Sequence, residues 1–260
     1  MLPVTRDSAA SQVAVITGAA RGIGRAVALS FAAQGSPVVI AARSADALAN
    51  TAADIERAGG QVLAVTTDVR DEAQVTALME RAVARFGRID VLVCGAATPV
   101  VRPTIELSLD DWNLVIATNL TGTFLCVREA GKHMLAQRSG RIVTFGAVNG
   151  ILPFPERLAH ATSKAGVIHL TKALAAEWTP LGVTVNCVVP GWTRTEVVDD
   201  YIDRGAIDVD KIEARTPARR MAEPDEIVRA VMFLSSPDAG FVSGQPLIVD
   251  GGWTIYGFYE

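Results

Sequence analysis

The 260-residue chain contains few cysteines, little net charge and no long apolar run. Its three cysteines, Cys94, Cys126 and Cys187, are scattered and odd in number, which argues against a disulfide framework and favours a reducing, cytoplasmic compartment. The formal net charge is −4 and there is no basic block, so neither nucleic acid nor an anionic membrane is an expected partner. No segment approaches the roughly 20 uninterrupted apolar residues of a transmembrane helix. Residues 1–11 also lack the apolar core of a signal peptide.

Strand-like and helix-like patterns alternate along the whole chain. Short apolar runs predict seven strands, at Gln12–Thr17, Pro37–Ala41, Gln61–Thr66, Asp90–Cys94, Arg141–Phe145, Val183–Val188 and Pro246–Val249. Helical patterns fall between them, ending at Gln34 and spanning Ala45–Ala58, Asp71–Phe86, Asp110–Leu135, Ala161–Trp178 and Pro224–Leu234. Continuous apolar strands are buried on both faces, which indicates a parallel sheet covered by helices. We therefore predict an α/β fold over residues 1–260, a single-domain Rossmann-type doubly wound parallel sheet with helices on both faces.

One segment interrupts this alternation late in the chain. Residues from about 192 to 218 are polar and charged and follow the sixth predicted strand. We expect this segment to form a lid over a substrate site.

A glycine-rich turn follows the first predicted strand and opens a helix. It reads Thr17-Gly18-Ala19-Ala20-Arg21-Gly22-Ile23-Gly24. Glycine at these positions permits a tight turn and lets a pyrophosphate approach the free N–H groups at the helix N-terminus. The turn therefore predicts a phosphate site formed by Gly18, Gly22, Ile23 and Gly24.

Further motifs follow in a fixed order, and with the glycine turn they resemble the short-chain dehydrogenase/reductase family over essentially the whole chain. They are Asp68-Val69, Asn119 within Thr118–Gly122, Lys164, Pro190-Gly191 with Thr193 and Thr195, and Val249–Gly252. The resemblance implies a dinucleotide cofactor. It assigns Asp68 and Val69 to the adenine and residues 190–195 to the nicotinamide, and makes Asn119 and Lys164 catalytic.

The residues after the second predicted strand favour NADP(H) over NAD(H). An acidic residue there would bind the ribose 2′-hydroxyl of NAD, but this chain has Ala42 followed by Arg43. Arg21, just before Gly22, matches a second cation of family members that use NADP. Guanidinium groups suit a 2′-phosphate by charge and geometry, so Arg21 and Arg43 predict NADP(H).

The catalytic set departs from the family pattern. Similar proteins use Asn, Ser, Tyr and Lys, but here His160 replaces the tyrosine four residues before Lys164, and Ala147 replaces the serine. The segment from Cys94 to Ala97 replaces the usual Asn-Asn-Ala-Gly beside the cofactor. His160 either acts as an acid or base, titrating nearer neutrality than a tyrosine, or fills the space of the missing ring.

Two functions of different class follow from this site. The first is an NADP(H)-dependent oxidoreductase that transfers hydride to or from a small apolar carbonyl, activated C=C or imine substrate. The alternative is a non-redox lyase, isomerase or cyclase, or a cofactor-binding pseudo-enzyme. Trp192, Phe154, Ile151 and Leu152 suggest an apolar pocket with an aromatic wall, and no metal site is predicted.

The C-terminal segment and the resemblance together predict an oligomer. Aromatic residues make up 6% of the chain, yet Trp253, Tyr256, Phe258 and Tyr259 crowd its end. Family members commonly assemble through the helices at Asp110–Leu135 and Ala161–Trp178 and through this segment. We expect a homotetramer or a homodimer, with the tail buried at an interface or over a neighbouring active site.

Overall fold

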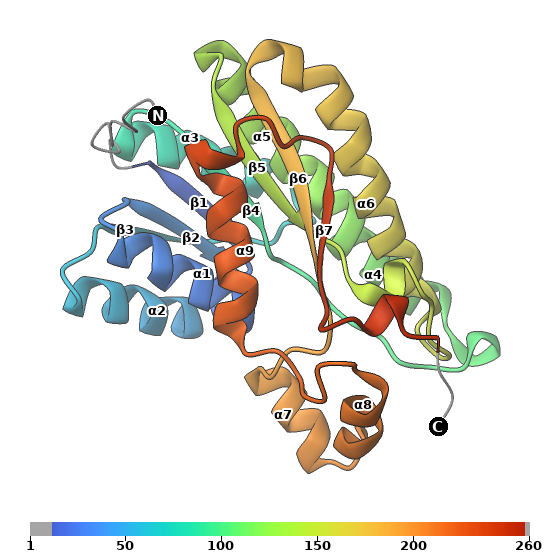
Figure 1. The fold of residues 1–260 in the computed structure, drawn as a ribbon. Coiled ribbons are helices and arrows are strands. Elements are labelled where there is room, and N and C mark those ends of the chain that lie inside the picture. Colours follow the sequence, from blue (N-terminus) through green and yellow to red (C-terminus); the bar gives the residue numbers. More distant parts are fainter. Residues whose placement is uncertain (1–11, 258–260) are drawn as a thin grey trace, which may run out of the picture.

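The computed structural model describes residues 12–257 and places seven strands in one sheet (Figure 1). The strands are β1 (Ala14–Thr17), β2 (Val38–Ala42), β3 (Val62–Thr66), β4 (Val91–Cys94), β5 (Gly140–Phe145), β6 (Val183–Pro190) and β7 (Pro246–Val249). All neighbouring strands are parallel, in the order β3-β2-β1-β4-β5-β6-β7. The order in which the strands are added reverses between β1 and β4, so a crevice opens beyond their carboxyl ends.

Helices cover both faces of the sheet, as the sequence predicts. One face packs against α1 (Gly22–Ala33), α2 (Ala45–Arg57) and α9 (Pro224–Ser235), and the other against α3 (Glu72–Phe86), α5 (Gly122–Gln137) and α6 (Leu158–Trp178). Neighbouring residues of a strand therefore pack on opposite faces of the sheet. Ala14 and Ile16 join the core under α1, α2 and α9, whereas Val15 joins the core under α3, α5 and α6. The predicted doubly wound sheet is confirmed.

The helix expected at Asp110–Leu135 is not uniform. It consists of α4 (Leu109–Ile116), a π-helical turn at Ala117–Thr121 and then α5. Apolar periodicity does not distinguish a π turn from an α turn, so the sequence pattern misses it. Gly122 lies directly after the turn, against Val69, where an added Cβ would come within 2.7 Å of a Val69 methyl carbon. π turns are frequent at functional sites, and this one carries Asn119.

Helix α6 starts three residues earlier than predicted, at Leu158 instead of Ala161. The residue before it, Arg157, makes no side-chain capping hydrogen bond, so the usual start signal is absent from the sequence. The earlier start places His160 inside the first turn of the helix.

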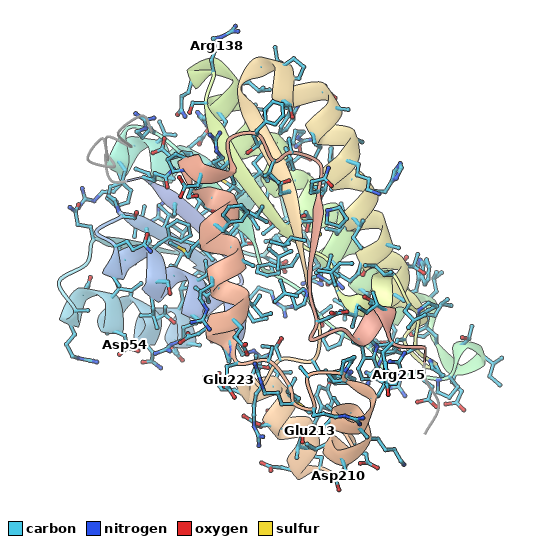
Figure 2. The ribbon with its side chains drawn as sticks, viewed as in Figure 1. Asp54, Arg138, Asp210, Glu213, Arg215 and Glu223 are labelled. Carbon is cyan, nitrogen blue, oxygen red and sulfur yellow. The ribbon has the colours of Figure 1, made fainter. Side chains whose placement is uncertain are left out.

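The segment predicted as a lid forms two short helices outside the sheet layers, α7 (Glu196–Asp203) and α8 (Val209–Arg215) (Figure 1). Thr195 and Asp208 cap their N-termini through side-chain oxygens. Charged residues of α8, among them Asp210, lie at the outer edge of the molecule (Figure 2).

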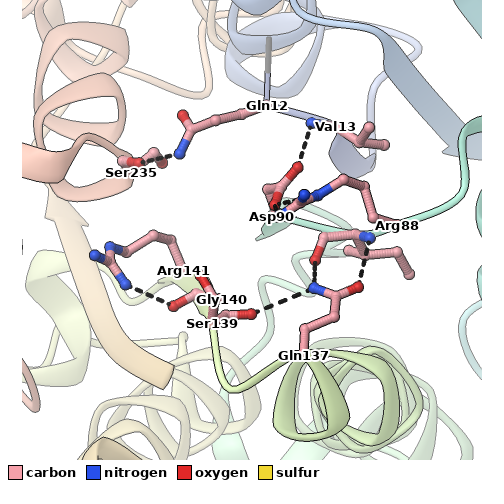
Figure 3. A network of polar contacts seen from close by, with 10 residues as sticks. Gln12, Val13, Arg88, Asp90, Gln137, Ser139, Gly140, Arg141 and Ser235 are labelled. Atoms are coloured by element: carbon pink, nitrogen blue, oxygen red, sulfur yellow. Dashed lines mark hydrogen bonds and ion pairs between the residues drawn. The ribbon is translucent and has the colours of Figure 1, made fainter. Parts of the chain in front are cut away.

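A polar network holds the end of the sheet where the strands begin (Figure 3). The Asp90 carboxylate accepts the backbone N–H of Val13 at 2.9 Å and the Arg88 guanidinium at 2.7 Å. The Gln137 amide donates to the Ile89 carbonyl at 2.8 Å. These contacts connect β1, β4 and the chain entering β5, which fixes the strands at the end opposite the crevice.

The three cysteines are buried and unpaired within the described chain, as expected of core residues. Burial raises the pKa of the Cys126 thiol to about 12 and also raises that of Cys94. Among residues 12–257, no helix combines the length and apolar character needed to cross a membrane.

Candidate active site

The glycine turn between β1 and α1 has the geometry of a phosphate site. A Cβ on Gly24 would come within 2.3 Å of the Gly18 carbonyl oxygen, so the helix can pack this closely only with glycine there. Gly18 and Gly22 have φ values of 71° and 56°, in the left-handed region. Arg21 supplies no side-chain cap, so the first N–H groups of α1 remain available to an anion.

The turn after β4 lies against the glycine turn. A Cβ on Gly18 would come within 2.5 Å of the Gly95 backbone, and a Cβ on Gly95 within 2.7 Å of the Thr17 carbonyl oxygen. Gly95 donates its N–H to that oxygen at 3.1 Å. The Cys94–Ala97 segment thus keeps the close backbone approach, although it lacks the asparagine side chains of the family pattern.

Positively charged side chains lie after β1 and β2, at the carboxyl ends of these strands. Arg43 and Arg21 are exposed, and Arg43 lies near enough to Asp68 to contribute to the lowered pKa of that carboxyl. The main cause of that lowering is the ion pair with Arg70, whose guanidinium lies 2.5 Å from the carboxylate. The Asp68 carboxylate is therefore paired with Arg70, and the contact of Asp68 and Val69 with the adenine remains a prediction.

A cavity of about 330 Å³ lies beyond the carboxyl ends of β1, β4, β5 and β6. It brings together eight of the predicted site residues: Ile23, Gly24, His160, Lys164, Pro190, Gly191, Thr193 and Thr195. Phe154 and Trp192 also line it, with their rings stacked 6.3 Å apart, so the predicted aromatic wall is present. Ile151 and Leu152 do not line it and are partly exposed.

A larger depression of about 630 Å³ lies between α1, α7 and α9, beside Gly22 and Thr195. It contains none of His160, Lys164 and Asn119. We therefore place the chemistry in the smaller cavity.

His160 has a partner that the sequence did not indicate. Its Nδ1 lies 2.9 Å from the side-chain nitrogen of Asn149 and 3.2 Å from the side-chain oxygen. We assign the shorter contact as the amide donating to Nδ1, which places the ring hydrogen on Nε2. The imidazole therefore has one ring nitrogen held by the protein and the other left for a substrate.

The surroundings of His160 lower the pKa of its imidazole. Burial, together with the positive charges of Lys164 and Arg157, lowers the pKa of His160 from 6.5 to about 3. The ring is therefore neutral at neutral pH. The pattern of the sequence shows the histidine but not how much protein covers it.

Lys164 is the titrating group of this cavity. Its ammonium is buried and donates to the Phe145 carbonyl oxygen at 2.8 Å. Burial lowers its pKa from 10.5 to about 8, which keeps most of the amine protonated at neutral pH.

Asn119 is buried but does not line the cavity. Its side chain accepts the Thr98 N–H at 2.8 Å, and its amide donates to the Thr98 carbonyl and, at 3.0 Å, to the Ser163 hydroxyl. Ser163 in turn donates to the His160 carbonyl oxygen at 2.7 Å. Asn119 thus connects the loop after β4 to the first turn of α6.

Comparison with known proteins identifies the family. A family model described as enoyl-(acyl carrier protein) reductase matches residues 18–254. The chain is 42% identical to the cis-4-hydroxycyclohexanecarboxylate dehydrogenase of Sinomonas cyclohexanicum, covering 95% of this chain and 98% of the relative. The chain belongs to the short-chain dehydrogenase/reductase family.

Two further relatives agree with this short-chain dehydrogenase/reductase assignment. The 3-oxoacyl-[acyl-carrier-protein] reductase of Synechocystis is 38% identical, covering 95% of this chain and 98% of that protein. The crystal structure of a gluconate 5-dehydrogenase from Burkholderia cenocepacia in complex with NADP and tartrate superposes with a TM-score of 0.89 at 35% identity, covering 94% of this chain and 96% of that chain.

Within this short-chain dehydrogenase/reductase, sequence reasoning missed three polar or charged residues of the cavity: Asn149, Arg157 and Tyr201. Asn149 follows Ala147 by two residues, so it is adjacent to the position where the family serine is expected. Arg157 is the residue just before α6, three residues before His160. Tyr201 belongs to α7, and no local pattern could bring it to this site.

Proposed function

We propose that this chain is an NADP(H)-dependent oxidoreductase that transfers hydride to or from a small carbonyl, activated C=C or imine substrate. One observation carries the proposal: a neutral His160, held at Nδ1 by Asn149, lines the same cavity as the buried Lys164 cation. The relatives are named dehydrogenases and reductases, which favours redox turnover over a lyase, isomerase or cyclase reaction.

The residues of the cavity suggest how the reaction proceeds. NADPH, when bound on the glycine turn, supplies the hydride. The Nε2–H of neutral His160 donates to the substrate oxygen or nitrogen and stabilises the negative charge that develops there. Lys164, with a pKa of about 8, would supply the proton that the substrate takes up after hydride addition and would then regain a proton from solvent. Asn149 fixes the tautomer, and Asn119 positions the turn that carries His160.

The two arginines after β1 and β2 support NADP(H) as the cofactor. Arg43→Asp is expected to weaken NADPH binding about 30- to 100-fold, because it removes a charge-assisted hydrogen bond to the 2′-phosphate and adds a repulsion. Calorimetric titration with NADPH and NADH measures the effect. Arg81→Asp makes the same charge change at an exposed position of α3 and should leave both affinities unchanged. A wild-type protein that prefers NADH would contradict the assignment.

Substitution of His160 tests the proposed mechanism. His160→Ala is expected to slow hydride transfer about 10²-fold, because the donor to the reacting atom is lost, and to leave NADPH affinity nearly unchanged. Single-turnover absorbance of bound NADPH with carbonyls, enones and imines gives the rates. His169→Ala, on an exposed position of the same helix, is the control.

Two results would contradict the proposal. Full activity of His160→Ala on the best substrate would show that the ring only fills the space of the family tyrosine. If no substrate class oxidises NADPH in the wild type, the redox function itself is wrong and a cofactor-binding pseudo-enzyme is favoured.

We also propose that residues 192–218 act as a lid, since α7 supplies Val197, Val198 and Tyr201 to the cavity wall. The segment encloses the site from outside the sheet layers. Its closure would exclude water from the reacting groups.

The exposed apolar side chains support the proposal that the chain forms a homotetramer. Leu109, Phe124, Leu158 and Ile255 are exposed on α4, α5, α6 and the C-terminal segment, where family members commonly pair. Light scattering at micromolar concentration is expected to give a tetramer or a dimer, and a monomer would refute the proposal.

Trp253 packs edge-on against Phe154, with the Arg215 guanidinium over its ring. Phe258 and Tyr259 lie outside the described residues.

A further inference from the structure

Arg157 contributes a cation to the cavity that the proposed reaction does not use. It lines the cavity together with His160 and Lys164, and no aspartate or glutamate of the described chain lines it. Whereas Lys164 donates to the Phe145 carbonyl, the Arg157 side chain has no hydrogen bond or ion pair with any group in residues 12–257. The guanidinium is half-buried at the cavity wall, so its N–H groups can pair with a bound anion.

The backbone just before Arg157 has an uncommon conformation. The preceding residue, Glu156, has a φ of 62°, which is uncommon for a residue with a side chain. Its carbonyl oxygen accepts the Arg102 N–H at 2.9 Å, which holds this conformation in place. Strained backbone of this kind is frequent at ligand-binding positions. Arg157 is the N-cap residue of α6, three residues before His160.

The residues around Arg157 indicate the chemical character of the rest of the ligand. Tyr201 on α7 and the Glu156 carboxylate both lie near enough to affect the pKa of Arg157, but only Tyr201 also lines the cavity. The stacked rings of Phe154 and Trp192 form an apolar wall beside them. This surface suits a ligand with one anionic end and an apolar body.

We propose that Arg157 binds a carboxylate of the substrate, and that the substrate is a small oxo- or hydroxy-carboxylic acid. This inference rests on the proposed function, since it takes the reacting carbonyl to lie at His160. A guanidinium matches a carboxylate in charge and fork geometry. A single guanidinium in a cavity of about 330 Å³, shared with the nicotinamide, favours a carboxylate over the larger and doubly charged phosphate.

The test compares acids with their methyl esters, which have nearly the same shape but no charge. Levulinate, oxocyclohexanecarboxylate and benzoylformate are titrated into the protein saturated with NADP⁺, so that calorimetry measures binding without turnover. At least one acid is expected to bind about 30- to 100-fold more tightly than its ester. Arg157→Gln should bring that ratio close to one, and Arg157→Lys should retain part of it.

Two controls separate the site from general charge effects. Arg204→Gln removes the same charge from the exposed end of α7, outside the cavity, and should keep the acid-to-ester ratio. NADPH affinity should be the same in Arg157→Gln as in the wild type. If it falls as far as the acid affinity does, Arg157 is a cofactor residue and the proposal is overturned.

The remaining outcomes are also decisive. If no acid binds better than its ester, or if dihydroxyacetone phosphate binds more tightly than every acid, the carboxylate site is wrong. If the acids bind in an Arg157-dependent way but no NADPH is oxidised in single turnover, the carboxylate site stands and the proposed redox function fails.

Discussion

Replacing Lys164 with methionine is expected to lower kcat/KM about 10³-fold and to weaken NADPH binding in the same variant. Methionine keeps the length of the chain and removes the charge. Lys164 is buried, donates to the Phe145 carbonyl and lines the cavity with His160. The family resemblance assigns its ammonium to the nicotinamide ribose, so one change removes a cofactor contact and a proton donor together.

The neighbouring histidine provides an independent measurement of this variant. The charge of Lys164 helps to lower the pKa of His160, so the pKa of His160 should rise in Lys164→Met. Nuclear magnetic resonance titration of the ring protons detects that change without turnover. Lys172→Met changes an exposed lysine of the same helix and should alter neither the rate nor the titration.

The wild-type pH profile follows from the same two groups. His160, with a pKa of about 3, does not change its charge between about pH 5 and pH 7. Lys164, with a pKa of about 8, is protonated below that pH and loses its proton above it. NADPH oxidation should therefore be flat below neutrality and decline as the pH rises through about 8. A decline between pH 5 and pH 7 would assign the titration to His160 and contradict this order.

Local sequence patterns account for the sheet because each strand is a continuous apolar run. Runs such as Val38–Ala42 are buried on both faces in this fold. The glycine turn was equally predictable, because its glycines stand at a fixed local spacing and Gly24 packs against the Gly18 carbonyl oxygen six residues earlier. These features depend on neighbours in sequence, and sequence reasoning finds them.

The parts that sequence reasoning missed depend on contacts between distant segments. Asn149 meets His160 only because the chain after β5 folds back onto α6. The π turn at Ala117–Thr121 has the same residue types as an ordinary helix, so periodicity cannot predict it. The low pKa of His160 depends on burial by several elements, which the residues adjacent to it in the sequence do not indicate.

Restoring the family donors is expected to create activity on simple ketones. The variant that combines His160→Tyr with Ala147→Ser should reduce them about 10³-fold faster than the wild type, since general acid catalysis and an oxyanion donor are each worth about 10²-fold or more. Ala147 and His160 both line the cavity, so both new hydroxyl groups would reach the substrate space. Steady-state oxidation of NADPH with a panel of apolar ketones measures the gain.

The matched control is His160→Phe with Ala147→Ser, which has the same ring size and lacks only the phenol hydroxyl. It should stay near the wild-type rate, because the serine alone cannot supply the proton. Loss of the Asn149 contact is common to both variants, so it cancels in the comparison. If the tyrosine variant is no faster than the phenylalanine variant, the two positions do not explain the missing ketone chemistry. The segment Cys94-Gly95-Ala96-Ala97 would then carry the divergence, because Gly95 and Ala97 line the same cavity beside the glycine turn.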